Sequence, residues 1–362
     1  MTPPLPTTGR TIPTIAITCG DPAGIGPEVA LLAWANRAAH ARAALRVVAP
    51  PDMLAAVAAG RPGMPALRIE TVAVDDRRPS APDTLLVVDC GGPMTPIRPA
   101  VVSASGGLAA ARSVEAAFAA TRAGHAAAIV TGPLHKEALH AAGYDVPGHT
   151  ELLARACGLD DDAASMMLWL PGADGGLGVV HATLHESLRS AVARLSPAAI
   201  EAAGRRLAPL LAALLGRGPR IAVAALNPHG GEGGLFGDDE TTIVRPAVTA
   251  LAAAGIDVAG PLPADTLFLR ASRGEFDGVV ALYHDQGHIP IKLLGMHRAV
   301  NITLGLPLVR TSVAHGTGFD IVGTGRADPA SMLAAIDAAA RLVAAGWPAP
   351  SGAAPACSPP SR

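Results

Sequence analysis

Short apolar runs recur along the sequence, and each is followed by Gly, Pro or His and then by a helix-like stretch. This alternation is typical of a parallel β-sheet whose strands are joined by helices. It constrains the fold more than any other feature and predicts the α/β class. The expected strands are Thr14 to Thr18, Leu45 to Val48, Leu85 to Val88, Ala127 to Val130, Gly178 to His181, Ile221 to Leu226, Val279 to Tyr283 and Val300 to Thr303.

Two of the expected helices carry clear local signals. Apolar residues recur at steps of three and four from Leu108 to Phe118, so one stripe of that segment can pack on a sheet. The second helix begins after a capping Ser196, with Pro197 at the first helical position, and ends at Gly216.

Length and composition bound the organisation and the partners. A chain of 362 residues exceeds the size of one ordinary hydrophobic core, so we expect two lobes around a cleft. No apolar run approaches the roughly 20 residues that a membrane span needs, and the start of the chain does not resemble a signal peptide. The expected location is the cytoplasm. Residues 1–13 and 346–362 are rich in Pro, Ala, Gly, Ser or Thr, and we expect both to be disordered.

Charge and cysteine content exclude two further classes. The net charge is −2 and Trp and Tyr are scarce, so the sequence lacks the basic and stacking residues of a nucleic-acid-binding protein. Four scattered cysteines without C-x-x-C spacing argue against a disulfide framework and a cysteine-built zinc site. The twelve histidines are the chemically informative residues.

Histidines follow three of the expected strands, at the edge where α/β sheets bind ligands. His185 lies beyond the strand that ends at His181, His229 follows Leu226, and His284 follows Tyr283. Three neutral imidazoles match the protein ligand count of catalytic zinc sites. A single histidine after a strand more often hydrogen-bonds a loop, but three together favour a metal site.

Spacing alone does not identify two of the three ligands. His181 and His185 are four residues apart, as are His284 and His288, so either member of each pair remains possible at this point.

Other polar segments suggest an anionic ligand. The sequence Gly20 to Glu28, GDPAGIGPE, follows a strand but matches neither a dinucleotide-binding fingerprint nor a phosphate-binding P-loop, so a tight structural turn and a ligand contact are both open. Lys292, Asn301 and Arg310 lie in or beside apolar segments, where a buried cation needs an anionic partner such as phosphate or carboxylate. Surface solvation is the alternative, chiefly for Lys292.

These residues resemble the 4-hydroxythreonine-4-phosphate dehydrogenase family of pyridoxal phosphate biosynthesis, including its relatives that act on four-carbon acid sugar phosphates. The resemblance extends from Thr14 to Val343 and is carried jointly by seven segments. They are GDPAGIGPE at 20–28, TGPLHK at 131–136, GHTE at 148–151, NPHGGEGG at 227–234, GPLPADTLF at 260–268, YHDQGH at 283–288 and VNITLGLPLVRTSVAHGT at 300–317.

The resemblance implies a fold similar to isocitrate and isopropylmalate dehydrogenases, with two α/β/α lobes around a cleft in a homodimer whose active site is shared between subunits. It assigns residues 14–135 plus 303–345 to a first lobe and 136–302 to a second lobe that carries the metal and the dimer interface. By position in the family motifs, the metal ligands are His185, His229 and His284, and the substrate contacts are His149, Thr150, Lys292, Asn301 and Arg310.

The implied reaction is oxidation of an alcohol β to a carboxylate by NAD or NADP, followed by loss of carbon dioxide from a small phosphorylated hydroxy acid. One divalent cation per site, Zn, Co, Mg or Mn, acts as a Lewis acid. Lys136 and Asp265 are the candidates for the catalytic base by their position in the matched motifs. A structural role is the alternative for both, and contact with a ligand histidine is a further alternative for Asp265.

Some positions depart from the family pattern and leave the substrate open. Cys19 replaces an expected Pro, and Ala314 stands where Asp is common. Several segments look closer to D-threonate or D-erythronate 4-phosphate dehydrogenases, and two also resemble a terephthalate diol dehydrogenase. Retained Lys136, His149 and Arg310 favour a phosphorylated substrate. A phosphate acyltransferase of similar fold and a metallohydrolase are the alternatives from other classes.

Overall fold

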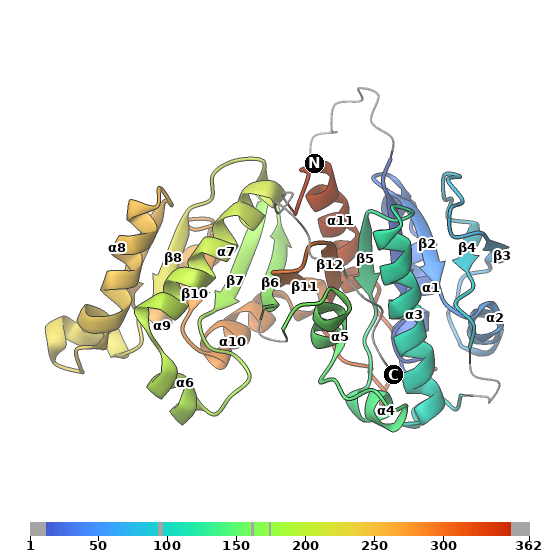
Figure 1. The fold of residues 1–362 in the computed structure, drawn as a ribbon, viewed down its shortest axis with the longest axis horizontal. Coiled ribbons are helices and arrows are strands. Elements are labelled where there is room, and N and C mark those ends of the chain that lie inside the picture. Colours follow the sequence, from blue (N-terminus) through green and yellow to red (C-terminus); the bar gives the residue numbers. More distant parts are fainter. Residues whose placement is uncertain (1–11, 93–96, 161–162, 174, 349–362) are drawn as a thin grey trace. The chain divides into compact units, whose positions relative to one another are not determined.

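The computed structural model describes residues 12–92, 97–160, 163–173 and 175–348. These residues form two compact units. The first lobe comprises residues up to 165 together with those from 305 onward, and the second lobe comprises residues 166–304. Figure 1 shows the elements of each lobe along the chain. The segments 1–11 and 349–362, which hold most of the two predicted disordered ends, lie outside the described residues.

The first lobe contains a six-stranded parallel sheet in the order β3-β4-β2-β1-β5-β12. Helix α3 packs against β1 and β5, and α11 packs against β5 and β12. These two helices therefore cover the central strands of the sheet. The elements are β1 (Thr14–Thr18), α1 (Gly26–Trp34), η1 (Arg37–His40), β2 (Ala44–Val48), α2 (Pro51–Gly60), β3 (Arg68–Val72), β4 (Thr84–Val88), α3 (Ala104–Arg122), β5 (Ala128–Thr131), α4 (Lys136–Ala141), α5 (His149–Ala156), β12 (Val309–Val313) and α11 (Ala330–Ala344).

The second lobe contains the strand order β11-β6-β7-β10-β8-β9. β6 and β7 form an antiparallel hairpin, whereas β7, β10, β8 and β9 run parallel. The elements are β6 (Ser165–Gly172), β7 (Gly175–His181), α6 (Leu188–Arg194), α7 (Pro197–Leu215), β8 (Ile221–Ala224), η2 (Pro228–Gly234), η3 (Glu240–Val244), α8 (Arg245–Ala253), β9 (Val258–Leu262), α9 (Ala264–Ser272), β10 (Gly278–Ala281), α10 (His284–Gly295), η4 (Met296–Arg298) and β11 (Val300–Leu304). The predicted α/β class is confirmed.

Helix α7 begins and ends at the residues that its sequence signals predicted. The Ser196 hydroxyl accepts a hydrogen bond from the Ala199 backbone N–H at 3.3 Å, and Gly216 closes the helix with a left-handed φ of 71°. The helix packs closely on β7 and β10, because a Cβ at Gly178 would lie 2.8 Å from Leu211 of α7. Close helix packing thus explains this strand glycine.

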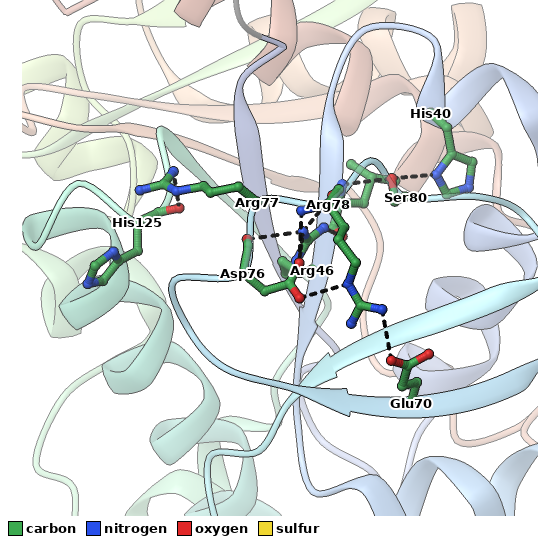
Figure 2. Close-up of polar contacts among 9 residues, drawn as sticks. His40, Arg46, Glu70, Asp76, Arg77, Arg78, Ser80 and His125 are labelled. Carbon is green, nitrogen blue, oxygen red and sulfur yellow. Dashed lines mark hydrogen bonds and ion pairs between the residues drawn. The ribbon is translucent and has the colours of Figure 1, made fainter.

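A buried arginine on an interior strand of the first-lobe sheet holds a neighbouring connection in place (Figure 2). Arg46 on β2 is 2% exposed and donates hydrogen bonds to the Asp76 carboxylate at 2.7 Å and to the Arg78 carbonyl at 2.6 Å. Burial lowers the pKa of Arg46, and the hydrogen bond and charge of Asp76 oppose that shift. Ser80 continues the network to His40 Nδ1 at 2.7 Å. These contacts hold the connection between β3 and β4 against β2.

The lobe boundary differs from the predicted one. Residues 136–165 had been expected in the second lobe, but the division falls after Ser165. The physical reason is packing, because Leu139 of α4 and Leu153 of α5 join the same buried cluster as Phe118 of α3. Within the described residues, no helix combines the length and hydropathy that a membrane span requires.

Candidate active site

Three neighbouring parallel strands of the second lobe end at one edge of its sheet, and each leads into a segment that carries a predicted ligand. β7 leads to His185, β10 leads to His284, and β8 leads to His229. Ligand sites in α/β sheets lie beyond the carboxyl ends of strands. The local fold therefore places all three histidines on the edge where chemistry is expected.

His185 and His284 line a common pocket of about 620 Å³, together with the polar residues Glu186, Tyr283 and Asp285. Their ring centroids lie 5.8 Å apart. Two imidazoles on one tetrahedral zinc ion have centroids roughly 5 Å apart, from a Zn–N distance of about 2 Å. His284 Nδ1 lies 2.6 Å from the Asp285 carboxylate, which leaves Nε2 for an ion. The separation of the pair is therefore within about 1 Å of that expected for two ligands of one cation.

The alternative histidines, His181 and His288, do not line this pocket. His288 Nδ1 lies 3.1 Å from His181 Nε2, and the His288 ring stacks on that of His284 with centroids 3.7 Å apart. Burial, reinforced by neighbouring histidines, lowers the pKa of His181 to about 3 and that of His288 to about 4. Both rings are therefore neutral near pH 7. His288 supports the His284 ring by stacking on it, and His181 contacts His288 in turn.

His229 is exposed in the loop η2, whose backbone is unusual. Residues 229–233 all have positive φ, including the non-glycine residues His229 at 52° and Glu232 at 45°. Such conformations cost on the order of 1–2 kcal/mol for a residue with a Cβ. Across the described ranges, no three His, Cys, Asp or Glu side chains form a group suited to a metal ion, so His229 does not join His185 and His284 within one chain.

Two polar side chains that sequence reasoning missed connect the histidine-bearing segments. The Thr183 hydroxyl donates to the Leu282 carbonyl at 2.8 Å. Gln286 accepts from the Leu282 N–H at 2.7 Å and donates to the Ala225 carbonyl at 2.8 Å. Gln286 is 7% exposed, and its place inside the motif of His284 was the one available signal. These bonds fix the ends of β7, β10 and β8 relative to one another.

The first lobe holds a buried cation at the expected substrate residues. Arg310 on β12 is 3% exposed and donates to the Thr131 hydroxyl at 2.7 Å. Burial lowers its pKa to about 10, while the charge of Glu151 opposes the shift. Burial and the charge of Arg310 hold the pKa of His149 well below its usual range. Thr150 follows His149 in the first turn of α5.

The remaining predicted residues are distributed over both lobes. Lys136 and Asp265 are exposed in the first turns of α4 and α9, and Lys292 is exposed on α10. Asn301 is half-buried on β11, and its Oδ1 has no hydrogen-bond partner among the described residues. The buried environment expected for Arg310 is confirmed. Lys292 is instead exposed to solvent within one chain, as the alternative interpretation of its sequence predicted.

The glycines of the segment 20–28 serve close packing between loops. A Cβ at Gly20 would clash with the Pro133 carbonyl, one at Gly24 with the Thr317 carbonyl, and one at Gly26 with the Cys19 carbonyl. The loops after β1, β5 and β12 therefore interlock through these glycines. This favours the structural turn over a phosphate-binding loop.

Arg61 is a third residue that the sequence did not reveal, and it lies in the first lobe. Its guanidinium donates to the Glu28 carboxylate at 2.8 Å and to the carbonyls of Pro22 at 3.0 Å and Gly24 at 2.8 Å. Glu28 has no exposed surface and also accepts from the Gly323 N–H at 2.9 Å. This ion pair thus fixes the glycine-containing turn in the first lobe.

Comparison with known proteins identifies the relatives of this chain. Residues 41–339 match the family model described as pyridoxal phosphate biosynthetic protein PdxA. A 4-hydroxythreonine-4-phosphate dehydrogenase from Beijerinckia indica subsp. indica is 46% identical, with 91% of this chain and 94% of the relative covered. A D-threonate 4-phosphate dehydrogenase from Cupriavidus necator is 44% identical, with 91% and 97% covered.

The fold has a similar solved structure. A crystal structure of 4-hydroxythreonine-4-phosphate dehydrogenase from Klebsiella pneumoniae matches with a TM-score of 0.79 and 42% identity, covering 92% of this chain and 99% of that one. The likeness therefore spans both lobes and every segment that carries a candidate site residue.

Proposed function

The chain belongs to the PdxA family, and from that premise we propose that it oxidises and decarboxylates 4-phosphooxy-L-threonine to 3-amino-2-oxopropyl phosphate in pyridoxal phosphate biosynthesis. It is an NAD(P)-dependent dehydrogenase, as the names of its relatives indicate. The single observation that carries the proposal is the likeness to such dehydrogenases over about nine tenths of the chain.

Three histidines would hold one divalent cation, Zn, Co, Mg or Mn, in this site. His185 and His284 already share a pocket, and His229 lies exposed on the neighbouring loop. A divalent cation supplies Lewis-acid polarisation of the substrate hydroxyl and a counter-charge for the electrons left when carbon dioxide departs. Neutral imidazoles are suitable ligands, and the hydrogen bond of His284 to Asp285 orients its ring for that role.

Arg310 and His149 would bind the anionic end of the substrate, with Thr150, Lys292 and Asn301 contributing further contacts. Support comes from the buried guanidinium of Arg310 and from the buried Nε2 of His149, which has no partner within the part of the chain described. A phosphate oxygen is a suitable acceptor for both groups. Lys136 and Asp265 remain the candidate bases for the hydroxyl proton.

A homodimer with a shared site is part of the proposal. The second lobe exposes large apolar side chains on α10 and beside His229, including Leu293 at 83%, Leu235 at 79% and Phe236 at 51%. Exposed apolar surface of this kind marks protein interfaces. A partner subunit seated there would supply the third ligand that His185 and His284 lack within one chain.

D-threonate 4-phosphate is the second candidate substrate, because relatives of 43–44% identity carry that name. It shares the phosphate, the carboxylate and the reactive hydroxyl with 4-phosphooxy-L-threonine and differs in bearing a hydroxyl in place of the amino group. A site that hydrogen-bonds one of these groups discriminates strongly against the other.

The test is reduction of NAD⁺ or NADP⁺ by the purified protein with Zn²⁺, Co²⁺ or Mg²⁺, followed by the near-ultraviolet absorbance of the reduced cofactor. We expect turnover with one of the two phosphorylated substrates and a far lower kcat/KM with 4-hydroxy-L-threonine or D-threonate, which lack the phosphate. The substrate of higher kcat/KM identifies the physiological reaction. Absence of cofactor reduction with both substrates and all three metals would refute the proposal and leave a phosphate acyltransferase as the next candidate.

A further inference from the structure

We propose that Glu240 is a positioning residue that holds the loop of His229 in its metal-binding conformation. The inference rests on the proposed function, because it takes His229 as a ligand. Glu240 begins η3, a turn of π-helix that precedes α8, and it is 3% exposed. Turns of this kind are rare and occur frequently near functional sites.

Where β8 ends, the backbone amides of the chain donate to the Glu240 carboxylate instead of to a neighbouring strand. The last sheet contact on this side is the Ala225 N–H to the Leu262 carbonyl at 2.8 Å. The next two amides, of Leu226 and Asn227, both donate to Glu240 Oε1, at 2.8 and 2.7 Å. A buried carboxylate with charge-assisted bonds is a strong constraint on the backbone. It sets the direction in which the chain enters the loop.

The second oxygen of Glu240 acts on the loop itself. Oε2 accepts from Asn227 Nδ2 at 3.1 Å, and a Cβ at Gly231 would lie 2.6 Å from it. Asn227 Nδ2 also donates to the Asp239 carboxylate at 2.8 Å. The carboxylate therefore lies directly under the left-handed run that contains His229. Strained backbone of this type persists only where its surroundings determine it.

A second side chain, Gln286, contacts the same chain segment just before the residues that Glu240 holds. Gln286 lies two residues after His284 on α10, and its side-chain amide donates to the Ala225 carbonyl at 2.8 Å. Two hydrogen bonds, from Gln286 to Ala225 and from Asn227 to Glu240, together with the short backbone segments 284–286 and 225–227, thus connect His284 to Glu240. Because Glu240 is buried, it acts on His229 through the backbone and not on the substrate.

Glu240→Gln is the sharpest variant because it preserves size while removing one acceptor. The Gln carbonyl can still accept from Leu226 and Asn227, but its amide then faces the Asn227 amide, donor against donor. Asp239→Asn is a milder variant that changes only the second acceptor of Asn227. Glu201→Gln, on the surface of α7 and paired with Arg205, is the matched control in the same lobe.

The experiment measures Co²⁺ affinity by chelator competition, the visible spectrum of bound Co²⁺, and amide exchange of residues 226–234 in the metal-free protein. We expect Glu240→Gln to raise the Co²⁺ dissociation constant by about tenfold or more, with an altered spectrum and faster exchange. Asp239→Asn should show a smaller effect and Glu201→Gln none. The thermal midpoint of each metal-free variant separates these effects from global unfolding.

Wild-type affinity, spectrum and exchange in Glu240→Gln would overturn the inference. If the wild-type protein itself binds no Co²⁺, the metal site of the proposed function fails instead. In that case the exchange measurement still decides the role of Glu240, because unchanged exchange of residues 226–234 refutes it and faster exchange confined to them supports it.

Discussion

His229→Ala is expected to abolish both metal retention and dehydrogenase activity while leaving the fold intact. His229 is exposed, so its replacement creates no cavity in the core. Removing one of three ligands should weaken binding by more than the roughly 100-fold that loss of an outer contact costs. Metal content after dialysis, measured by atomic emission, and kcat with saturating added metal together check the prediction.

His297→Ala is the matched control, because His297 is also an exposed histidine of the second lobe. It should retain wild-type metal content and activity. His288→Ala is less suitable as a silent variant, since His288 stacks on His284 and is 7% exposed. Equal metal loss in His229→Ala and His297→Ala would show that the assignment of His229 is wrong.

Arg310→Met is expected to raise KM for the phosphorylated substrate by at least about 30-fold. Truncating one partner of a buried, charge-assisted contact costs roughly 2–5 kcal/mol. Met retains much of the apolar stem, and burial already opposes the charge of Arg310, as its lowered pKa of about 10 indicates. The free protein should therefore keep its fold, and steady-state kinetics measure the effect.

Arg326→Met provides the comparison at an exposed arginine of the same lobe. It should leave both KM and kcat unchanged. The substrate lacking phosphate supplies a second check, because Arg310→Met should hardly alter its already low kcat/KM. A similar fold-change for both substrates would contradict a role of Arg310 in binding phosphate.

The sequence allowed the class of fold to be predicted because the strands buried on both faces have continuous apolar runs. Thr14–Thr18 is a strand with the predicted bounds. β12 was missed because Arg310 interrupts its apolar run, and β6 was missed because a hairpin places no helix between it and β7. The lobe boundary lies 30 residues later than expected, because Leu139 and Leu153 pack in one cluster with Phe118, a tertiary contact that local sequence does not reveal.

The candidate ligands could be predicted from residue types at strand ends, but the hydrogen bonds that hold their loops in place could not. Local pattern placed His185, His229 and His284 after three strands that the structure makes neighbours. It offered no signal for the bonds of Glu240 to Asn227, because 13 residues separate them in sequence. Such contacts become visible only when the loop and the following helix are brought together.

In the proposed homodimer one metal site takes histidines from two subunits, and mixing two inactive variants tests this arrangement most directly. His229→Ala and His284→Ala proteins are combined, subunit exchange is verified by native mass spectrometry, and activity is measured. If the ligands come from different subunits, half of the dimers contain one intact site, and about a quarter of wild-type activity returns. If exchange is complete and no activity returns, the shared metal site is contradicted.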